Sequence, residues 1–163
     1  MALGAMDDSG DLNILLVDAN PADAELTVRA LRRARIGNDL IRLESGAEAL
    51  EFLFGAAGRD ERPAANLGLI LLELRLPKVD GVELLRRIKS DPRTRTVPVA
   101  MLSALSERRE IARCYQLGAN SYLVKPANPT QFSEVVCQAG AYWMRRNRTA
   151  RRERRSECPL SRA

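Results

Sequence analysis

The chain has 163 residues, 45% hydrophobic and 29% charged, which suits one domain of ordinary size with a real core. No segment approaches the roughly 18 apolar residues of a membrane span, and residues 1–11 lack the apolar run of a signal peptide. The net charge of +5 is uneven, because residues 145–163 hold eight arginines against two glutamates, or +6, which leaves −1 for residues 1–144.

The first part of the chain alternates short apolar runs with amphipathic segments. Leu12–Val17 is predicted to be a strand, and the proline at position 21 suits the first turn of a helix that runs to about Arg35. After a break at a glycine and an asparagine, Asp39–Leu43 is a short predicted strand and Gly46–Phe54 a predicted helix. A polar loop is expected over 55–66.

The middle of the chain holds its most hydrophobic segment, Leu67–Leu74. A nearly continuous apolar run of this length is typical of a strand that is buried on both faces of a parallel sheet. The turn that follows leads into a predicted helix, Val82–Lys89, and Val97–Leu102 is a second buried strand.

The last part adds two helices and a strand. Ser106 is predicted to cap a helix that runs to Leu117 and stops at a glycine. Ser121–Val124 is the final predicted strand, and Thr130–Met144 is the final predicted helix.

Five predicted strands therefore alternate with five predicted helices over residues 12–144. This order predicts a doubly wound α/β domain with a parallel sheet, between a flexible segment 1–11 and a basic tail 145–163. In such sheets function lies outside the carboxyl ends of the strands. Those ends carry Asp18, Glu73, Ser103 and Lys125.

The residue inventory argues against several kinds of chemistry. The sequence has no histidine, and its three cysteines, Cys114, Cys137 and Cys158, are far apart. Histidine-based acid–base catalysis is excluded, and zinc would have almost no ligands. We interpret two of the cysteines as small core residues and expect no enzyme activity.

Four segments, in this order and spacing, resemble the response-regulator receiver family. They are LLVDAN (15–20), LILLELRLPKVDG (69–81), PVAMLSA (98–104) and GANSYLVKP (118–126). The resemblance implies a flavodoxin-like receiver fold with a five-stranded parallel sheet flanked by five helices. It also implies two-component phosphorelay signalling, and it is greatest to single-domain regulators associated with bacterial phytochrome histidine kinases.

The resemblance assigns roles to the residues at the strand ends. Asp18 occupies the position of the first metal-binding acid, and Ser103 and Lys125 occupy the positions that contact the phosphoryl oxygens. Tyr122 stands where an aromatic side chain often changes rotamer on activation.

Two family positions are altered. Glu73 stands at the phospho-acceptor position in place of aspartate, and Ala19 stands where a second acid usually binds Mg²⁺. The carboxylate of Glu73 reaches about 1.5 Å farther, and a displacement of about 1 Å can cost about a hundredfold in an in-line attack. We expect this carboxylate to pair with Lys125 and to accept a hydrogen bond from Ser103.

The charge of the site is expected to be low. Asp18, Glu73 and Lys125 sum to −1, or to zero if Arg75 also contributes its charge, so a metal would have little to offset. We expect no resident cofactor, and at most weak Mg²⁺ binding at Asp18 and Glu73. Three interpretations of Glu73 stay open: a built-in mimic of the phosphorylated state, a remnant that only neutralises Lys125, or a residue that still accepts a phosphoryl group.

The expected partners are proteins. The resemblance implies a histidine kinase, possibly a bacterial phytochrome, and a homodimer that uses the last two helices and the last strand. The arginine tail has no interleaved aromatic residues, and no DNA-reading domain follows it, so nucleic-acid binding is the weaker interpretation and a solvated tail the stronger. We expect a cytoplasmic protein without membrane contact.

Overall fold

The computed structural model describes residues 12–37, 39–55 and 63–149. The predicted flexible segment 1–11, Cys158 and most of the predicted tail lie outside these residues. The described helices and strands follow one another in the predicted order, with two short additions that were not predicted, one of them within the loop that was expected over 55–66. They are β1 (Asn13–Val17), α1 (Pro21–Arg33), β2 (Leu40–Leu43), α2 (Gly46–Phe54), the 3₁₀ helix η2 (Pro63–Asn66), β3 (Leu67–Leu72), α3 (Gly81–Ser90), β4 (Val99–Ser103), α4 (Arg108–Gln116), β5 (Ser121–Val124), α5 (Pro129–Ala141) and the π-helical turn η3 (Tyr142–Arg146).

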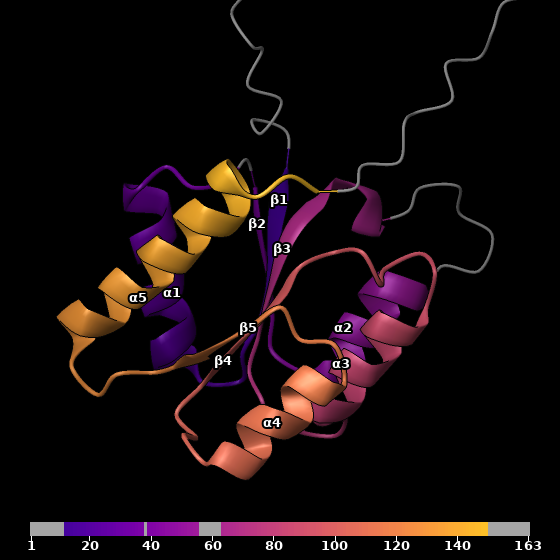
Figure 1. The fold of residues 1–163 in the computed structure, drawn as a ribbon. Coiled ribbons are helices and arrows are strands. Elements are labelled where there is room, and N and C mark those ends of the chain that lie inside the picture. The colour runs from indigo at the N-terminus through magenta and orange to yellow at the C-terminus, as the bar shows by residue number, and fades with distance from the viewer. Residues whose placement is uncertain (1–11, 38, 56–62, 150–163) are drawn as a thin grey trace, which may run out of the picture.

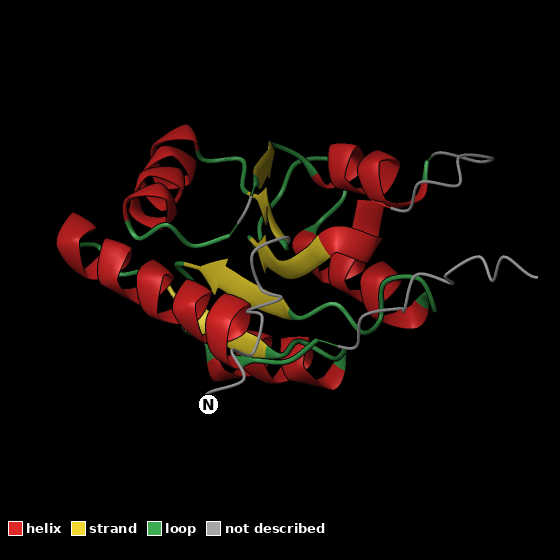
Figure 2. Ribbon diagram, turned by 90° about the horizontal axis from the view of Figure 1, so that it is seen from above, coloured by secondary structure: helices red, strands yellow, loops and turns green. Residues whose placement is uncertain are grey.

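The five strands form one sheet in the order β2-β1-β3-β4-β5, and every neighbouring pair is parallel. Helices α1 and α5 cover one face of the sheet, and α2, α3 and α4 cover the other (Figure 1). The view from above shows the sheet between these two helical layers (Figure 2). The predicted doubly wound fold is confirmed.

The core consists of two apolar layers, one on each face of the sheet. Along β3, Leu69 and Leu71 pack in the layer under α1 and α5, whereas Ile70 and Leu72 pack in the layer under α2, α3 and α4. All of these side chains are fully buried, as the nearly continuous apolar run predicts.

Two helix ends differ from the predictions. The residue that caps α4 is Glu107, and no side chain caps its backbone N–H groups, so the predicted cap at Ser106 is wrong. The last helix does not run unbroken to Met144, because α5 ends at Ala141 and η3 continues the chain. This wider turn places Met144 in the core, with 2% of its surface exposed.

In the described part of the chain, every helix is too short or too polar to cross a bilayer.

Candidate functional site

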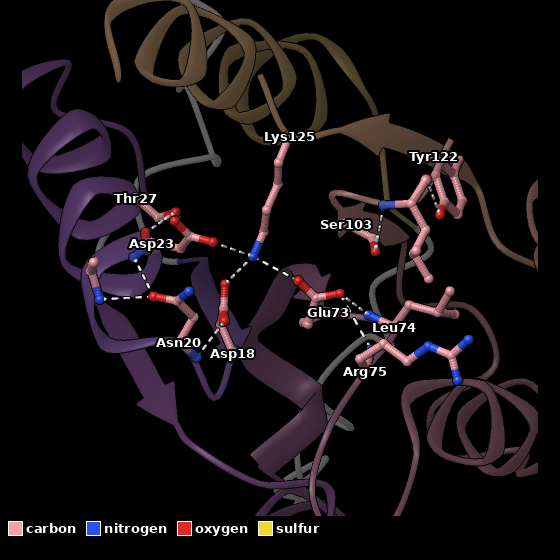
Figure 3. Close-up of polar contacts among 12 residues, drawn as sticks. Asp18, Asn20, Asp23, Thr27, Glu73, Leu74, Arg75, Ser103, Tyr122 and Lys125 are labelled. Carbon is pink, nitrogen blue, oxygen red and sulfur yellow. Dashed lines mark hydrogen bonds and ion pairs between the residues drawn. The ribbon is translucent and has the colours of Figure 1, made fainter. Parts of the chain in front are cut away.

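The carboxyl ends of four strands bring the predicted residues together. Asp18 follows β1, Glu73 follows β3, Ser103 ends β4 and Lys125 follows β5. Figure 3 shows the side chain of Lys125 extending between Asp18 and Glu73, with Ser103 and Tyr122 on the β4 side. The sequence therefore predicted the place of the site and most of its members.

Lys125 is the centre of the cluster. Its Nζ lies 2.8 Å from Oδ2 of Asp18, 2.9 Å from Oδ2 of Asp23 and 2.6 Å from Oε2 of Glu73. The side chain of Lys125 is 5% exposed, that of Asp18 1% and that of Glu73 11%. The predicted pairing of Glu73 with Lys125 is therefore present in the structure, and it is largely shielded from water.

The second oxygen of Glu73 points to the backbone. Oε1 accepts hydrogen bonds from the backbone N–H of Leu74 at 2.7 Å and of Arg75 at 3.2 Å. Ser103 Oγ instead accepts from the N–H of Leu105 at 3.3 Å, and within the described ranges no hydrogen bond joins it to Glu73. The expected bond between Ser103 and Glu73 is wrong, because the first turn of the β3–α3 loop supplies nearer donors.

Asp23 is the member that sequence reasoning missed. It lies in the first turn of α1, whose N-cap Asn20 accepts from the N–H groups of Ala22 and Asp23. This cap starts the helix directly after β1 and places the carboxylate of Asp23 over the strand ends. An acid in the first turn of a helix that begins at a strand end was the available signal.

The charge of the cluster also differs from the sequence estimate. Asp18, Asp23 and Glu73 against Lys125 give −3 + 1 = −2. Arg75 does not add to this sum, because its side chain is exposed and points away from Lys125 (Figure 3). The expectation of a site near neutrality is therefore wrong.

Burial and charge shift the protonation equilibria of this cluster. Burial raises the pKa of Asp18, and this outweighs its hydrogen bonds with Lys125 and the backbone of Asn20. Burial by itself would lower the pKa of Lys125, but its hydrogen bonds to Asp18, Glu73 and Asp23 together raise it. The ammonium is thus held charged, and Asp18 takes up a proton more easily than an ordinary aspartate does.

Tyr122 lies beside the cluster on β5. Its hydroxyl donates a hydrogen bond to the carbonyl oxygen of Leu105 at 2.7 Å, and its ring packs against the apolar layer under α2, α3 and α4. Burial raises the pKa of this hydroxyl, so it keeps its proton and stays a donor. The bond ties β5 to the β4–α4 loop next to Ser103.

The β3–α3 loop fixes Glu73 from the other side. The N–H of Gly81 donates to the carbonyl of Leu74 at 2.9 Å, and a Cβ at position 81 would lie 2.1 Å from the carbonyl oxygen of Glu73. Only glycine permits α3 to begin this close to the site. In the same loop Lys78 has a φ of 67°, a left-handed conformation that lysine seldom adopts.

The donor set is a poor fit to a divalent cation. Ala19 offers no side-chain oxygen, and Lys125 already binds an oxygen of each of the three carboxylates. Across the residues that the structure describes, no three acidic, cysteine or histidine side chains are arranged to hold a metal. A cation that bound these oxygens would have to compete with the ammonium of Lys125.

Two of the cysteines lie away from the site. Cys114 is buried in the layer under α2, α3 and α4, and Cys137 is half-buried, with its Sγ donating to the carbonyl of Ala30 at 3.4 Å. Burial raises the pKa of both thiols. Both are small, protonated packing residues, in keeping with the prediction.

Comparison with known proteins identifies the family. Residues 14–137 match the response regulator receiver domain. The chain belongs to this family. It is a receiver of two-component signalling, and its topology is that of the solved receivers.

The curated relatives include two signalling regulators. The chain is 36% identical over 150 residues to the probable methanogenesis regulatory protein FilR2 of Methanothrix harundinacea, covering 87% of this chain and 94% of the relative. It is 34% identical over 131 residues to response regulator Rcp1 of Synechocystis, covering 80% and 88%.

Phytochrome response regulators are prominent among the similar solved structures. The phosphorylated cyanobacterial phytochrome response regulator RcpA has a TM-score of 0.77 at 33% identity, over 85% of this chain and 98% of that one. The bacteriophytochrome response regulator AtBRR has a TM-score of 0.63 at 38% identity, over 81% and 94%. A third, the Rcp1 structure, contains Mn²⁺, with a TM-score of 0.77 at 32% identity over 85% and 98%. The receiver is therefore close to the phytochrome-associated branch of the family.

Proposed function

We propose that this receiver is an atypical response regulator that signals without phosphorylation. Glu73 takes the place of the acceptor aspartate, and the domain acts by binding other proteins. Its effect comes through docking, competition or sequestration on a histidine kinase or a downstream partner.

The state of Glu73 carries this proposal. One carboxylate oxygen is bound by the ammonium of Lys125 and the other by two backbone N–H groups. An acceptor oxygen must attack a phosphoryl group in line, and both oxygens of Glu73 already bind donors that would have to be released or rearranged for such an attack. The longer side chain has folded onto the partners that would otherwise meet a phosphoryl group.

Of the three interpretations of Glu73, we favour the mimic of the phosphorylated state. The Lys125 contact is compatible with both a mimic and a passive remnant, but the position of Tyr122 favours the mimic. Its ring is held inward by the bond to Leu105, on the β4–α4 loop beside Ser103. Glu73 and Tyr122 are thus held in fixed positions on the two sides of the surface to which a partner would bind.

The partners follow from the relatives. RcpA is named as a phytochrome response regulator and AtBRR as a bacteriophytochrome response regulator, and we propose a histidine kinase, in particular a bacterial phytochrome, as the protein on which this receiver docks. We further propose that it works in the cytoplasm as a homodimer and without a resident metal.

A phosphotransfer assay tests the central proposal. The full chain is incubated with Mg²⁺ and either acetyl phosphate or a phosphorylated histidine kinase, and phosphoprotein is measured by intact mass. We expect no stable adduct on the wild-type chain. The double variant Ala19→Asp/Glu73→Asp, which restores both altered positions, is expected to gain an acyl phosphate.

The variant Glu73→Gln is the control for labelling at other residues. Stable phosphorylation of the wild-type chain that disappears in Glu73→Gln would overturn the proposal in favour of a conventional receiver. If Glu73→Gln also leaves binding to a cognate kinase unchanged, Glu73 is a remnant and the mimic is excluded.

A further inference from the structure

Six arginines gather at the end of the molecule opposite the Lys125 cluster. Helices α1 and α5 lie side by side and both run away from the site, so their C-terminal ends meet at this pole (Figure 1). We call the exposed arginines there the basic pole. They are Arg32, Arg33, Arg35, Arg145, Arg146 and Arg148.

Arg145 joins the two halves of the basic pole. Its Nη2 donates hydrogen bonds to the carbonyl oxygens of Ala34 at 2.7 Å and Arg35 at 3.3 Å, at the C-terminal end of α1. This contact satisfies carbonyls that the helix leaves open and offsets the negative end of its dipole. Residues that are 110 positions apart in the sequence thereby form one surface.

The basic pole is rich in positive charge. Residues 31–40 and 142–149 contain six arginines and one aspartate, 6 − 1 = +5. Within the described ranges no carboxylate forms an ion pair with these six, whereas Arg29, Arg86 and Arg93 each have an acidic partner.

The chemistry of the surface selects the partner. It carries only guanidinium groups, which bind phosphate oxygens bidentately, and no lysine. Of the exposed large apolar side chains of the described residues, Tyr115, Val124 and Tyr142, only Tyr142 borders the basic pole, at the start of η3. A protein interface or an inserted membrane surface would need such apolar anchors, whereas a nucleic-acid backbone does not.

We propose that the basic pole is a sequence-independent binding surface for the phosphate backbone of nucleic acid. It differs from a simple tail because Arg32 and Arg33 belong to α1, and Arg35 follows directly after the end of that helix. Each of the two helices has 13 residues, so the pole lies about 20 Å from the Lys125 cluster and leaves that end free to dock.

Binding of the full chain to a fluorescein-labelled mixed-sequence DNA duplex tests this proposal, with affinity measured by anisotropy between about 50 and about 200 mM salt. The variant Arg32→Gln/Arg33→Gln/Arg35→Gln is expected to make the negative slope of log K against log salt shallower by about 2.7, or about 0.9 for each lost phosphate contact. A second variant, Arg146→Gln/Arg148→Gln, is expected to make this slope shallower by about 1.8.

The matched control removes three exposed arginines from α4, Arg108→Gln/Arg109→Gln/Arg113→Gln, and is expected to leave the slope within error. Three results would overturn the proposal. The first is that Arg32→Gln/Arg33→Gln/Arg35→Gln binds DNA with an unchanged slope. The second is that the slope of the control changes as much as the slope of that variant. The third is that the chain binds phosphatidylserine vesicles and not DNA.

Discussion

At the scale of single residues, one lysine holds three carboxylates that would otherwise repel one another. Two of these, Asp18 and Glu73, are almost completely shielded from water, so their charges are weakly screened. The lysine thus holds the side chain of Glu73 in one arrangement.

Replacement of Lys125 by methionine tests this stabilising role. Without the ammonium, three carboxylates share a shielded site, and we expect the free energy of unfolding to fall by about 3 kcal/mol in urea denaturation at neutral pH. The double variant Lys125→Met/Asp18→Asn should recover part of this loss.

The loss should also depend on pH. The raised folded-state pKa of Lys125 means that its contribution is complete below its ordinary value of 10.5 and disappears as the pH rises through the folded-state value. If the stability deficit of Lys125→Met shrinks as the pH rises from neutral toward 10.5, this assignment is contradicted.

Asp18→Asn is expected to raise the free energy of unfolding at neutral pH, because Lys125 keeps its ion pairs with Asp23 and Glu73. In addition, burial disfavours the charge of Asp18 more than its contact with Lys125 favours it. Because its folded-state pKa is raised, the wild type approaches the variant in stability as the pH falls toward the ordinary value of 3.8. Glu134→Gln, an exposed substitution within α5, is the control and should change neither stability nor its pH profile.

The sequence predicted Asp18, Glu73 and Lys125 as neighbours because parallel strands end at one edge of the sheet. It could not predict Asp23, because the reach of that carboxylate depends on how α1 leaves β1. Nor could it predict the donors to Glu73 Oε1, which are backbone groups that every loop offers.

At the scale of elements, the start of α3 is the tightest contact of the site. Gly81→Ala would place a methyl group against the backbone of Glu73, which cannot move without disturbing β3. We expect a loss of roughly 3 kcal/mol in unfolding free energy, at the upper end for overpacking.

Gly55→Ala is the matched control for that change. The nearest atoms to a Cβ at position 55 belong to the flexible end of the Glu51 side chain, which can turn away. A loss for Gly81→Ala no larger than that for Gly55→Ala would show that α3 can retreat from the site without cost.

Strands and helices were predictable where apolar periodicity is strong, as in β3, β5 and α2. The ends of these elements were less predictable. Ser106 and Glu107 both suit the start of a helix, and only the path of the β4–α4 loop decides between them. The break between α5 and η3 has no sequence signal, because it follows from the burial of Met144 against the sheet.

At the scale of the whole molecule, a groove of about 460 Å³ lies along β5 and α5, lined in part by Val124, Tyr142 and Trp143. Val124 and Tyr142 are exposed, and they are the apolar surface that a homodimer through this edge would cover. We expect sedimentation equilibrium at micromolar concentration to give a dimer.

The variant Val124→Ser/Tyr142→Ser is expected to shift that equilibrium toward the monomer by at least about tenfold in Kd, which corresponds to about 1.4 kcal/mol. Arg95→Ser, an exposed change remote from the groove, should leave it unchanged. A wild-type chain that sediments as a monomer would refute the dimer.

The only tryptophan of the chain, Trp143, donates from its indole Nε1 to Ser121 Oγ at 3.2 Å, in the groove between η3 and β5. All indole emission of the molecule therefore originates at a single junction, on the strand whose other end leads to Lys125. Dimer formation through the groove should shift the wavelength and change the intensity of this fluorescence, because Trp143 lines the groove, whereas DNA bound at the arginines, which do not line it, should change it less. The protein thus carries an unlabelled optical probe that can separate its two proposed contacts.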